Sequence, residues 1–198
     1  MNALTKLAAV NLLLQSIGEA PTNSLLTNSG SITAEVSQAS TELDTAARSL
    51  QLSRNWPWNY DTKVTLNPDV DGVITIPANA AKIDGHEPCT DVVIRARPNG
   101  QMALWNRTDR SWTFTAPVVV DVTYTYDFDQ LPEIAKEYVV RAASRRFQAK
   151  ELGDQADDQF NDLEEKRAWF ALLKDEAASS DANLFRNPYV SRMAWHRR

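Results

Sequence analysis

A long alternating segment between two helical patterns is the feature that most restricts the fold. Residues 118–126 read VVVDVTYTY, with an apolar side chain at every second position and polar residues such as Asp121 and Thr123 between them. This alternation predicts a strand with one buried face and one solvated face. Pro132 follows shortly afterwards, where the first turn of a helix tolerates it, so a helix is predicted next.

Several shorter strand signals precede this segment. The sequence NWPWNY at residues 55–60 places a proline between two tryptophans, which ends the preceding helical pattern because proline disrupts helix interiors. Short apolar or alternating runs follow, separated by turn sequences such as NPDVDG and PNG. Together these runs predict a β-meander. The runs are residues 62–66, 73–76, 92–97, 102–105 and 112–114.

Amphipathic helical patterns flank this β region on both sides. Residues 4–17, which end at Gly18, and residues 32–50 carry apolar side chains at three- and four-residue steps. Two further helices are predicted, one from the turn at Pro132 up to Gly153 with its apolar stripe at residues 134–147, and one at about residues 154–178. The predicted buried side of the last helix consists of Phe160, Leu163, Trp169, Phe170, Leu172 and Leu173.

This layout predicts an α+β protein. Helices from both ends of the chain must pair to bury their apolar stripes. We therefore expect a bundle of about four helices from both chain ends, an inserted antiparallel β domain and an extended C-terminal tail. The expected bundle comprises residues 1–55 and 128–178, the β domain residues 56–127 and the tail residues 179–198.

Cysteine and histidine usage gives no metal or cofactor signature. The sequence has one cysteine, Cys89, and two histidines, His86 and His196, which form no cluster with metal-ligand spacing. A Cys89–His86 pair is not selected as a catalytic site, because Pro88 between them favours a turn. We expect neither a cofactor nor a catalytic or structural metal.

Membrane insertion and secretion are not expected either. The apolar run at residues 7–14 is far shorter than the roughly 20 residues of a membrane-spanning helix. No small-residue cleavage site follows it, so it does not read as a secretory signal. The protein is expected to be made and kept in the cytoplasm, without membrane contact.

Charge is unevenly distributed along the chain. The net charge is -5, but from residue 179 onwards four arginines stand against Asp181, so this segment carries +3 and the rest carries -8. An acidic body disfavours a general nucleic-acid binder, because phosphate contacts supply most of that affinity.

Catalytic signatures are missing from the sequence. It contains no GxSxG, Walker phosphate loop, GxGxxG or HExxH motif, and we expect no enzymatic activity. The best candidate for chemistry is the acidic group Asp127, Asp129 and Glu133, which in principle offers an acid and a base for glycoside hydrolysis. We favour a structural interpretation, since acids at a helix start stabilise its dipole.

Two other groups have competing interpretations. The basic residues of the third helix, including Arg141 and Arg145, could face DNA, but acids from the next helix favour a salt-bridged helical hairpin. Four of the six tryptophans lie in or beside the β region, where packing in the core is favoured over a glycan-binding face. These four are Trp56, Trp58, Trp105 and Trp112.

The last segment is short yet rich in large apolar side chains. It can pack back on its own domain, or it can dock on a neighbouring subunit or partner. Docking is favoured, because aromatic residues and arginine are the usual anchors of interfaces. The predicted partner-binding residues are Phe185, Arg186, Tyr189, Arg192, Met193, Trp195, Arg197 and Arg198.

Three sequence blocks carry a resemblance to a known family. These are VNLLLQSIGEAP at residues 10–21, SRNWPWNYDTKVTLNPDVDGVI at residues 53–74 and YDFDQLPEIAKEYVVRAASRRF at residues 126–147. In this order and at this length they resemble the tail tubular protein A family, the head-to-tail adaptor or gatekeeper of short-tailed podovirus bacteriophages. Residues 78–114 and the tail depart from the family pattern.

The resemblance implies a structural subunit of the virion tail. Such a subunit forms a homo-oligomeric ring, a dodecamer in the virion, that links the portal protein to a tail nozzle of the tail tubular protein B type. DNA passes through the channel of the ring without specific binding. The alternatives from other classes are a tail-associated glycan hydrolase and a carbohydrate-binding module.

Overall fold

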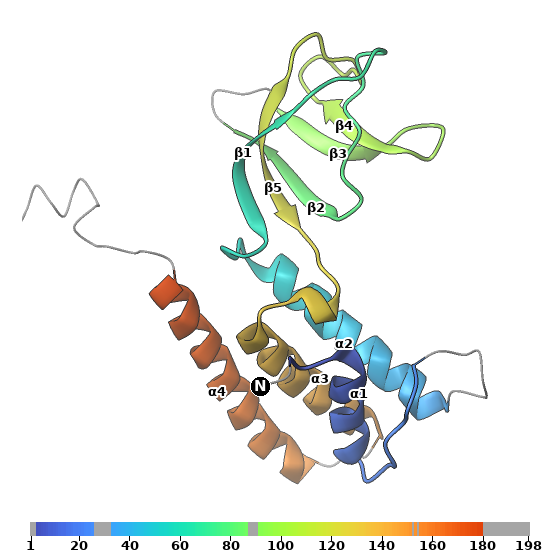
Figure 1. Ribbon diagram of the computed structural model, residues 1–198, viewed down its shortest axis with the longest axis vertical. Coiled ribbons are helices and arrows are strands. Elements are labelled where there is room, and N and C mark those ends of the chain that lie inside the picture. The colour runs from blue at the N-terminus through green and yellow to red at the C-terminus, as the bar shows by residue number, and fades with distance from the viewer. Residues whose placement is uncertain (1–2, 26–32, 87–90, 152, 154, 180–198) are drawn as a thin grey trace, which may run out of the picture. The chain divides into compact units, whose positions relative to one another are not determined.

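The computed structural model describes residues 3–25, 33–86, 91–151, 153 and 155–179, the last of these with the side chains of residues 161–178 (Figure 1). The chain forms two compact units. The helical unit comprises Met1–Leu43 and Pro132–Arg198, and the β unit comprises Asp44–Leu131. Helices and antiparallel sheets together confirm the predicted α+β class.

Helices α1 (Lys6–Gln15), α3 (Glu133–Glu151) and α4 (Gln155–Ser179) belong to the helical unit, and α2 (Ala34–Ser53) begins in it and ends in the β unit. The Thr5 hydroxyl accepts a hydrogen bond from the Ala8 N–H at the start of α1. Beyond its end, Gly18 adopts a φ of +82°, as the sequence predicts for a glycine stop. Helix α3 packs against both α1 and α4 (Figure 1).

Helix α4 differs from the prediction made for its buried side. Leu172 is buried at 2% exposure, and Trp169 and Leu173 are half-buried. The prediction was wrong for Leu163 and Phe170, which are 53% and 67% exposed. These two residues are seven positions apart, so they share one face of the helix, and α4 packs on α3 through a different face. The side chain of Phe160 lies outside the described residues.

The β unit contains a three-stranded sheet with β5 (Val118–Tyr124) at its centre. Strands β1 (Tyr60–Leu66) and β2 (Ala80–Gly85) pair with it on either side, and both pairings are antiparallel. A separate hairpin consists of β3 (Val92–Ala96) and β4 (Met102–Asn106). The predicted β-meander was wrong, because β1 pairs with β5 and not with the next predicted run at residues 73–76. Within the described residues, only the hairpin of β3 and β4 joins two consecutive predicted runs.

The core of the β unit confirms the burial predicted for one face of residues 118–126. Val118, Val120 and Val122 are buried with residues from the hairpin and from the connecting segments. Predicted strands at residues 73–76 and 112–114 form only isolated bridges, yet they supply Ile74, Ile76 and Phe114 to this core.

The opposite face of β5 is less solvated than expected. Thr123 is buried at 3% exposure, and its hydroxyl donates a hydrogen bond of 3.4 Å to Asn55 Oδ1. The chain that leaves α2 covers this end of the strand. The alternation of apolar and polar residues in the sequence does not predict that another segment buries a polar position of the strand.

Two buried amides join the end of α2 to the end of β5. The Gln51 side chain accepts from the Tyr126 N–H at 2.7 Å and donates to the Tyr126 carbonyl at 3.0 Å. Asn59 donates from Nδ2 to the carbonyl oxygens of Gln51 and Tyr124, both at 3.0 Å. Because both amides are fully engaged while buried, this polar junction fixes how the strand region leaves the helix.

Candidate interaction surfaces

The three acids proposed as a catalytic alternative have local structural roles. The Asp127 N–H donates to Gln130 Oε1 at 3.1 Å, and Asp129 lies in the first turn of the short helix η2 (Phe128–Gln130). Glu133 accepts from Lys136 Nζ at 2.8 Å and from the Leu4 N–H at 3.1 Å. These two hydrogen bonds, with Lys136 the larger cause, lower the pKa of Glu133. A carboxyl group held ionised is a poor general acid, which favours the helix-start interpretation.

The salt-bridged hairpin predicted for α3 and α4 is confirmed at Arg145. Its Nη1 lies 2.7 Å from Asp162 Oδ1 and 3.2 Å from Glu165 Oε2. A hydrogen bond from Lys166, followed by other contacts that include Arg145, lowers the pKa of Asp162. Arg145 is therefore engaged between two carboxylates of α4 and is not directed at a phosphate.

The tryptophans of the β unit pack mainly on one another and on the core. Trp56 is fully buried, donates from Nε1 to the Leu50 carbonyl at 2.8 Å and stacks on Trp58, which confirms the core interpretation for this residue. Trp105 and Trp112 are half-buried and meet edge to face at a centroid distance of 4.6 Å. The Arg95 guanidinium lies 4.9 Å from the centre of the Trp105 ring.

His86 pairs with Asp121. Cys89, the other member of the cysteine–histidine pair considered from the sequence, lies outside the described residues. His86 Nδ1 is 2.9 Å from Asp121 Oδ1, and the same carboxylate accepts from the Lys63 N–H and the Tyr60 hydroxyl. The Lys63 hydrogen bond is the main reason why the pKa of Asp121 is lowered. Lys63 has a φ of 59° at the irregularity in β1, so Asp121 stabilises a local bulge.

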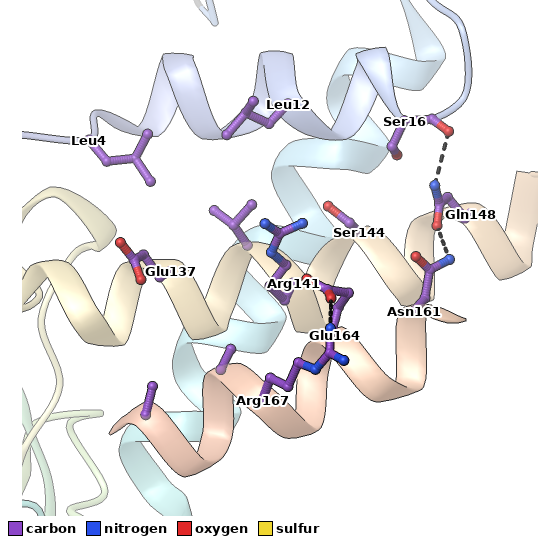
Figure 2. A pocket seen from close by; sticks show the side chains of 13 residues that line it. Leu4, Leu12, Ser16, Glu137, Arg141, Ser144, Gln148, Asn161, Glu164 and Arg167 are labelled. Carbon is purple, nitrogen blue, oxygen red and sulfur yellow. Dashed lines mark hydrogen bonds and ion pairs between the residues drawn. The ribbon is translucent and has the colours of Figure 1, made fainter. Parts of the chain in front are cut away.

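A groove of about 580 Å³ runs along the helical unit between α1, α3 and α4 (Figure 2). Its apolar lining comes from all three helices and from Leu4, two residues before the start of α1. Small side chains on α4 leave room beside the leucines of the first segment. The apolar residues are Leu4, Leu12, Val140, Ala168 and Ala171, of which Leu12 is 45% exposed.

One end of this groove is closed by a chain of hydrogen bonds. Gln148 donates from Nε2 to the Ser16 carbonyl at 3.0 Å, and Asn161 donates from Nδ2 to Gln148 Oε1 at 2.5 Å (Figure 2). These contacts connect the end of α1 to α3 and α4. The groove is thus a fixed feature of the three-helix packing.

The charged lining of the groove is only partly neutralised. Arg167 pairs with Glu164 at 2.7 Å, whereas Arg141 is exposed and forms no ion pair within the described part of the chain. Its guanidinium lies in the space between α1 and α4 (Figure 2). Glu137, one turn earlier on α3, lies towards the Leu4 end. A guanidinium is thus available in the middle of the groove.

Sequence reasoning did not predict this groove. Its one usable signal is the pair of alanines on α4, Ala168 and Ala171, which lie one turn apart and leave space for another surface. The residues that the sequence did select for partner binding, from Phe185 to Arg198, lie outside the described residues. The structure therefore adds a surface that the sequence did not select.

Two other kinds of feature are absent from the described residues. No group of three or more histidine, cysteine, aspartate or glutamate side chains is placed to hold a metal ion within the described ranges. No described helix is both long enough and apolar enough to cross a membrane.

An open groove with apolar residues in its lining and a helix with exposed apolar side chains are features found in subunits of protein assemblies. The sequence matches the family model of the tail tubular proteins over residues 7–182, which includes parts of both units. The chain belongs to the tail tubular protein family and is a structural component of a phage tail. No curated protein matches the chain.

Proposed function

We propose that this protein is the subunit of a head-to-tail adaptor ring that links the portal protein to the tail nozzle and lines the DNA exit channel. The observation that carries the proposal is the family match over residues 7–182, which extends across the helical and β units. The ring is a dodecamer in the virion, and it assembles in the host cytoplasm. Its function is mechanical and involves no catalysis.

Charge distribution supports a role in DNA passage. Outside the last segment the chain carries a net charge of -8, and the basic side chain Arg145 is engaged by acids of the same unit. A channel that repels phosphate allows DNA to slide, whereas a basic channel would retain it. The acidic body thus suits a conduit better than a DNA-binding surface.

The segment of residues 179–198 is proposed to dock on the portal or on a neighbouring subunit. Phe185, Tyr189, Met193 and Trp195 supply apolar anchors, and Arg186, Arg192, Arg197 and Arg198 supply salt-sensitive steering towards an acidic partner. In this arrangement the helical bundle of residues 1–55 and 128–178 forms the repeating wedge of the ring.

Imaging of the protein with a purified portal tests the adaptor function. The expected result is an added ring layer on the portal in negative stain, while the protein alone remains mainly monomeric in light scattering. A portal that gains no layer at saturating protein would contradict the adaptor function.

Removal of residues 181–198 tests the docking segment. The truncated protein is expected to keep its melting temperature and to lose portal binding at least about tenfold, because several anchors are removed together. A large loss of melting temperature would instead identify an intramolecular strap. Unchanged portal binding would exclude docking by this segment.

A further inference from the structure

We propose that the turn Asp69–Val70–Asp71 of one copy inserts into the groove between α1, α3 and α4 of the next copy around the ring. This inference rests on the proposed ring function and identifies the contact through which neighbouring subunits meet. The occupant of the groove is a second copy of this chain. The contact is heterologous, as required when one subunit repeats around a closed ring.

The turn is held rigidly by its own hydrogen bonds. Asp69 Oδ1 accepts from the N–H groups of Asp71 at 2.9 Å and Val73 at 2.8 Å. The backbone adds a bond from the Asp69 N–H to the Val73 carbonyl at 2.9 Å. Gly72 has a φ of +77°, and a Cβ atom there would lie 2.6 Å from a Thr113 methyl group. A preorganised loop loses little conformational entropy on binding.

The tip of this turn presents an apolar side chain between two acids. Val70 is 102% exposed, the highest exposure among the large hydrophobic residues of the described chain. Asp69 and Asp71 are both exposed, and neither forms an ion pair within the described ranges. A fully exposed valine that the fold holds outward contributes nothing to the core, but it suits a complementary hollow.

The groove offers apolar residues for the valine of the turn and a guanidinium for its carboxylates. Leu12 of α1 and the two alanines of α4 provide apolar lining for one aliphatic side chain, and the groove volume of about 580 Å³ exceeds what one valine needs. Arg141 supplies a guanidinium that forms no ion pair within the described ranges, while Glu137, one turn earlier on α3, forms none there either. A carboxylate of the turn can therefore pair with Arg141 while Val70 covers Leu12.

The charge of Arg141 also decides between two segments of the chain. The basic segment of residues 179–198 would bring four arginines to a groove whose free central charge is already positive. The acidic turn brings two carboxylates instead. Glu164 is neutralised by Arg167, and Glu137 lies towards the Leu4 end, so the middle of the groove favours an acidic occupant.

Charge reversal on each side of the contact provides the test. Asp71→Arg and Arg141→Glu are each expected to raise the protein concentration needed for half-maximal ring formation on the portal by about tenfold or more, because each places like charges opposite one another. Both residues are exposed, so melting temperatures should not change. Asp84→Arg on β2 and Arg146→Glu on α3 are matched controls, which should assemble like the wild type.

Mixing the two defective variants is the decisive measurement. In an alternating ring, each substituted turn meets a substituted groove and each native turn meets a native groove. An equimolar mixture should therefore form rings at close to the wild-type concentration, although neither variant does so alone. Val70→Ser should weaken assembly without affecting the melting temperature.

The outcomes separate this inference from the adaptor function. If the wild type adds a ring layer and Asp71→Arg or Arg141→Glu adds it equally well, the turn-to-groove contact is wrong and the adaptor function stands. A mixture that assembles no better than either variant also overturns the contact. If the wild type adds no layer to the portal, the adaptor function fails and this contact fails with it.

Discussion

Helices α3 and α4 lie side by side and have similar sequence patterns, but they use their apolar residues differently. Helix α3 buries residues on more than one side, because it packs against both α1 and α4. Helix α4 buries Leu172 against the unit but leaves Leu163 and Phe170 exposed. The comparison teaches that apolar residues at helical spacing are not all buried against the same unit, because a helix packed on one side leaves its other apolar residues exposed.

The largest expected effect comes from the core of α3. Phe147 is fully buried, so Phe147→Ala should lower the free energy of unfolding by about 3–5 kcal/mol through lost burial and a cavity. Urea denaturation measures this loss. A change below about 1 kcal/mol would show that α3 is not the central helix of its unit.

A smaller effect is expected at the ion pairs that join the two helices. Arg145→Met should lower the free energy of unfolding by about 1 kcal/mol, since Asp162 and Glu165 then face each other without their shared cation. The loss should shrink in about 1 M salt, where exposed charges are screened. Arg146→Met, on the same helix but exposed, is the control. An equal loss in both variants would mean that the pairing contributes nothing.

The pH dependence of the same contact is expected to be weaker still. The folded-state pKa of Asp162 lies below its ordinary value of 3.8, chiefly through the hydrogen bond from Lys166. The ionised carboxylate therefore contributes stability that is complete above 3.8 and is lost as the pH falls through the lowered pKa. Asp162→Asn should melt below the wild type at about pH 6 and at the same temperature at about pH 2. A constant difference across this range would contradict the assignment.

The smallest effect on stability is expected on the outward face of α4. Phe170→Ser should change the free energy of unfolding by less than about 0.5 kcal/mol, because Phe170 is 67% exposed. It should nevertheless reduce ring formation on the portal, since it removes an exposed aromatic anchor. Leu172→Ser, the same kind of change on the buried face, should destabilise the fold instead. Normal ring formation by Phe170→Ser would exclude this face as a contact.

Local patterns were sufficient for much of the secondary structure. Helical spacing predicted α1, α2, α3 and α4 to within a few residues, and alternation predicted β5 as the principal strand. The strand β2, with the sequence AAKIDG, was missed, because it has little alternation and is stabilised by pairing with β5. Hydrogen bonds to a neighbouring strand depend on residues far away in the sequence.

By itself, the sequence determined the α+β class, the main helices and the family resemblance, since these depend on local spacing and on the order of sequence blocks. Only the tertiary structure decided the order β1-β5-β2, the exposure of Leu163 and Phe170 and the groove with its free Arg141. Each of these depends on which faces of distant segments meet. Periodicity predicts that a face is apolar, but it does not identify the surface that covers it.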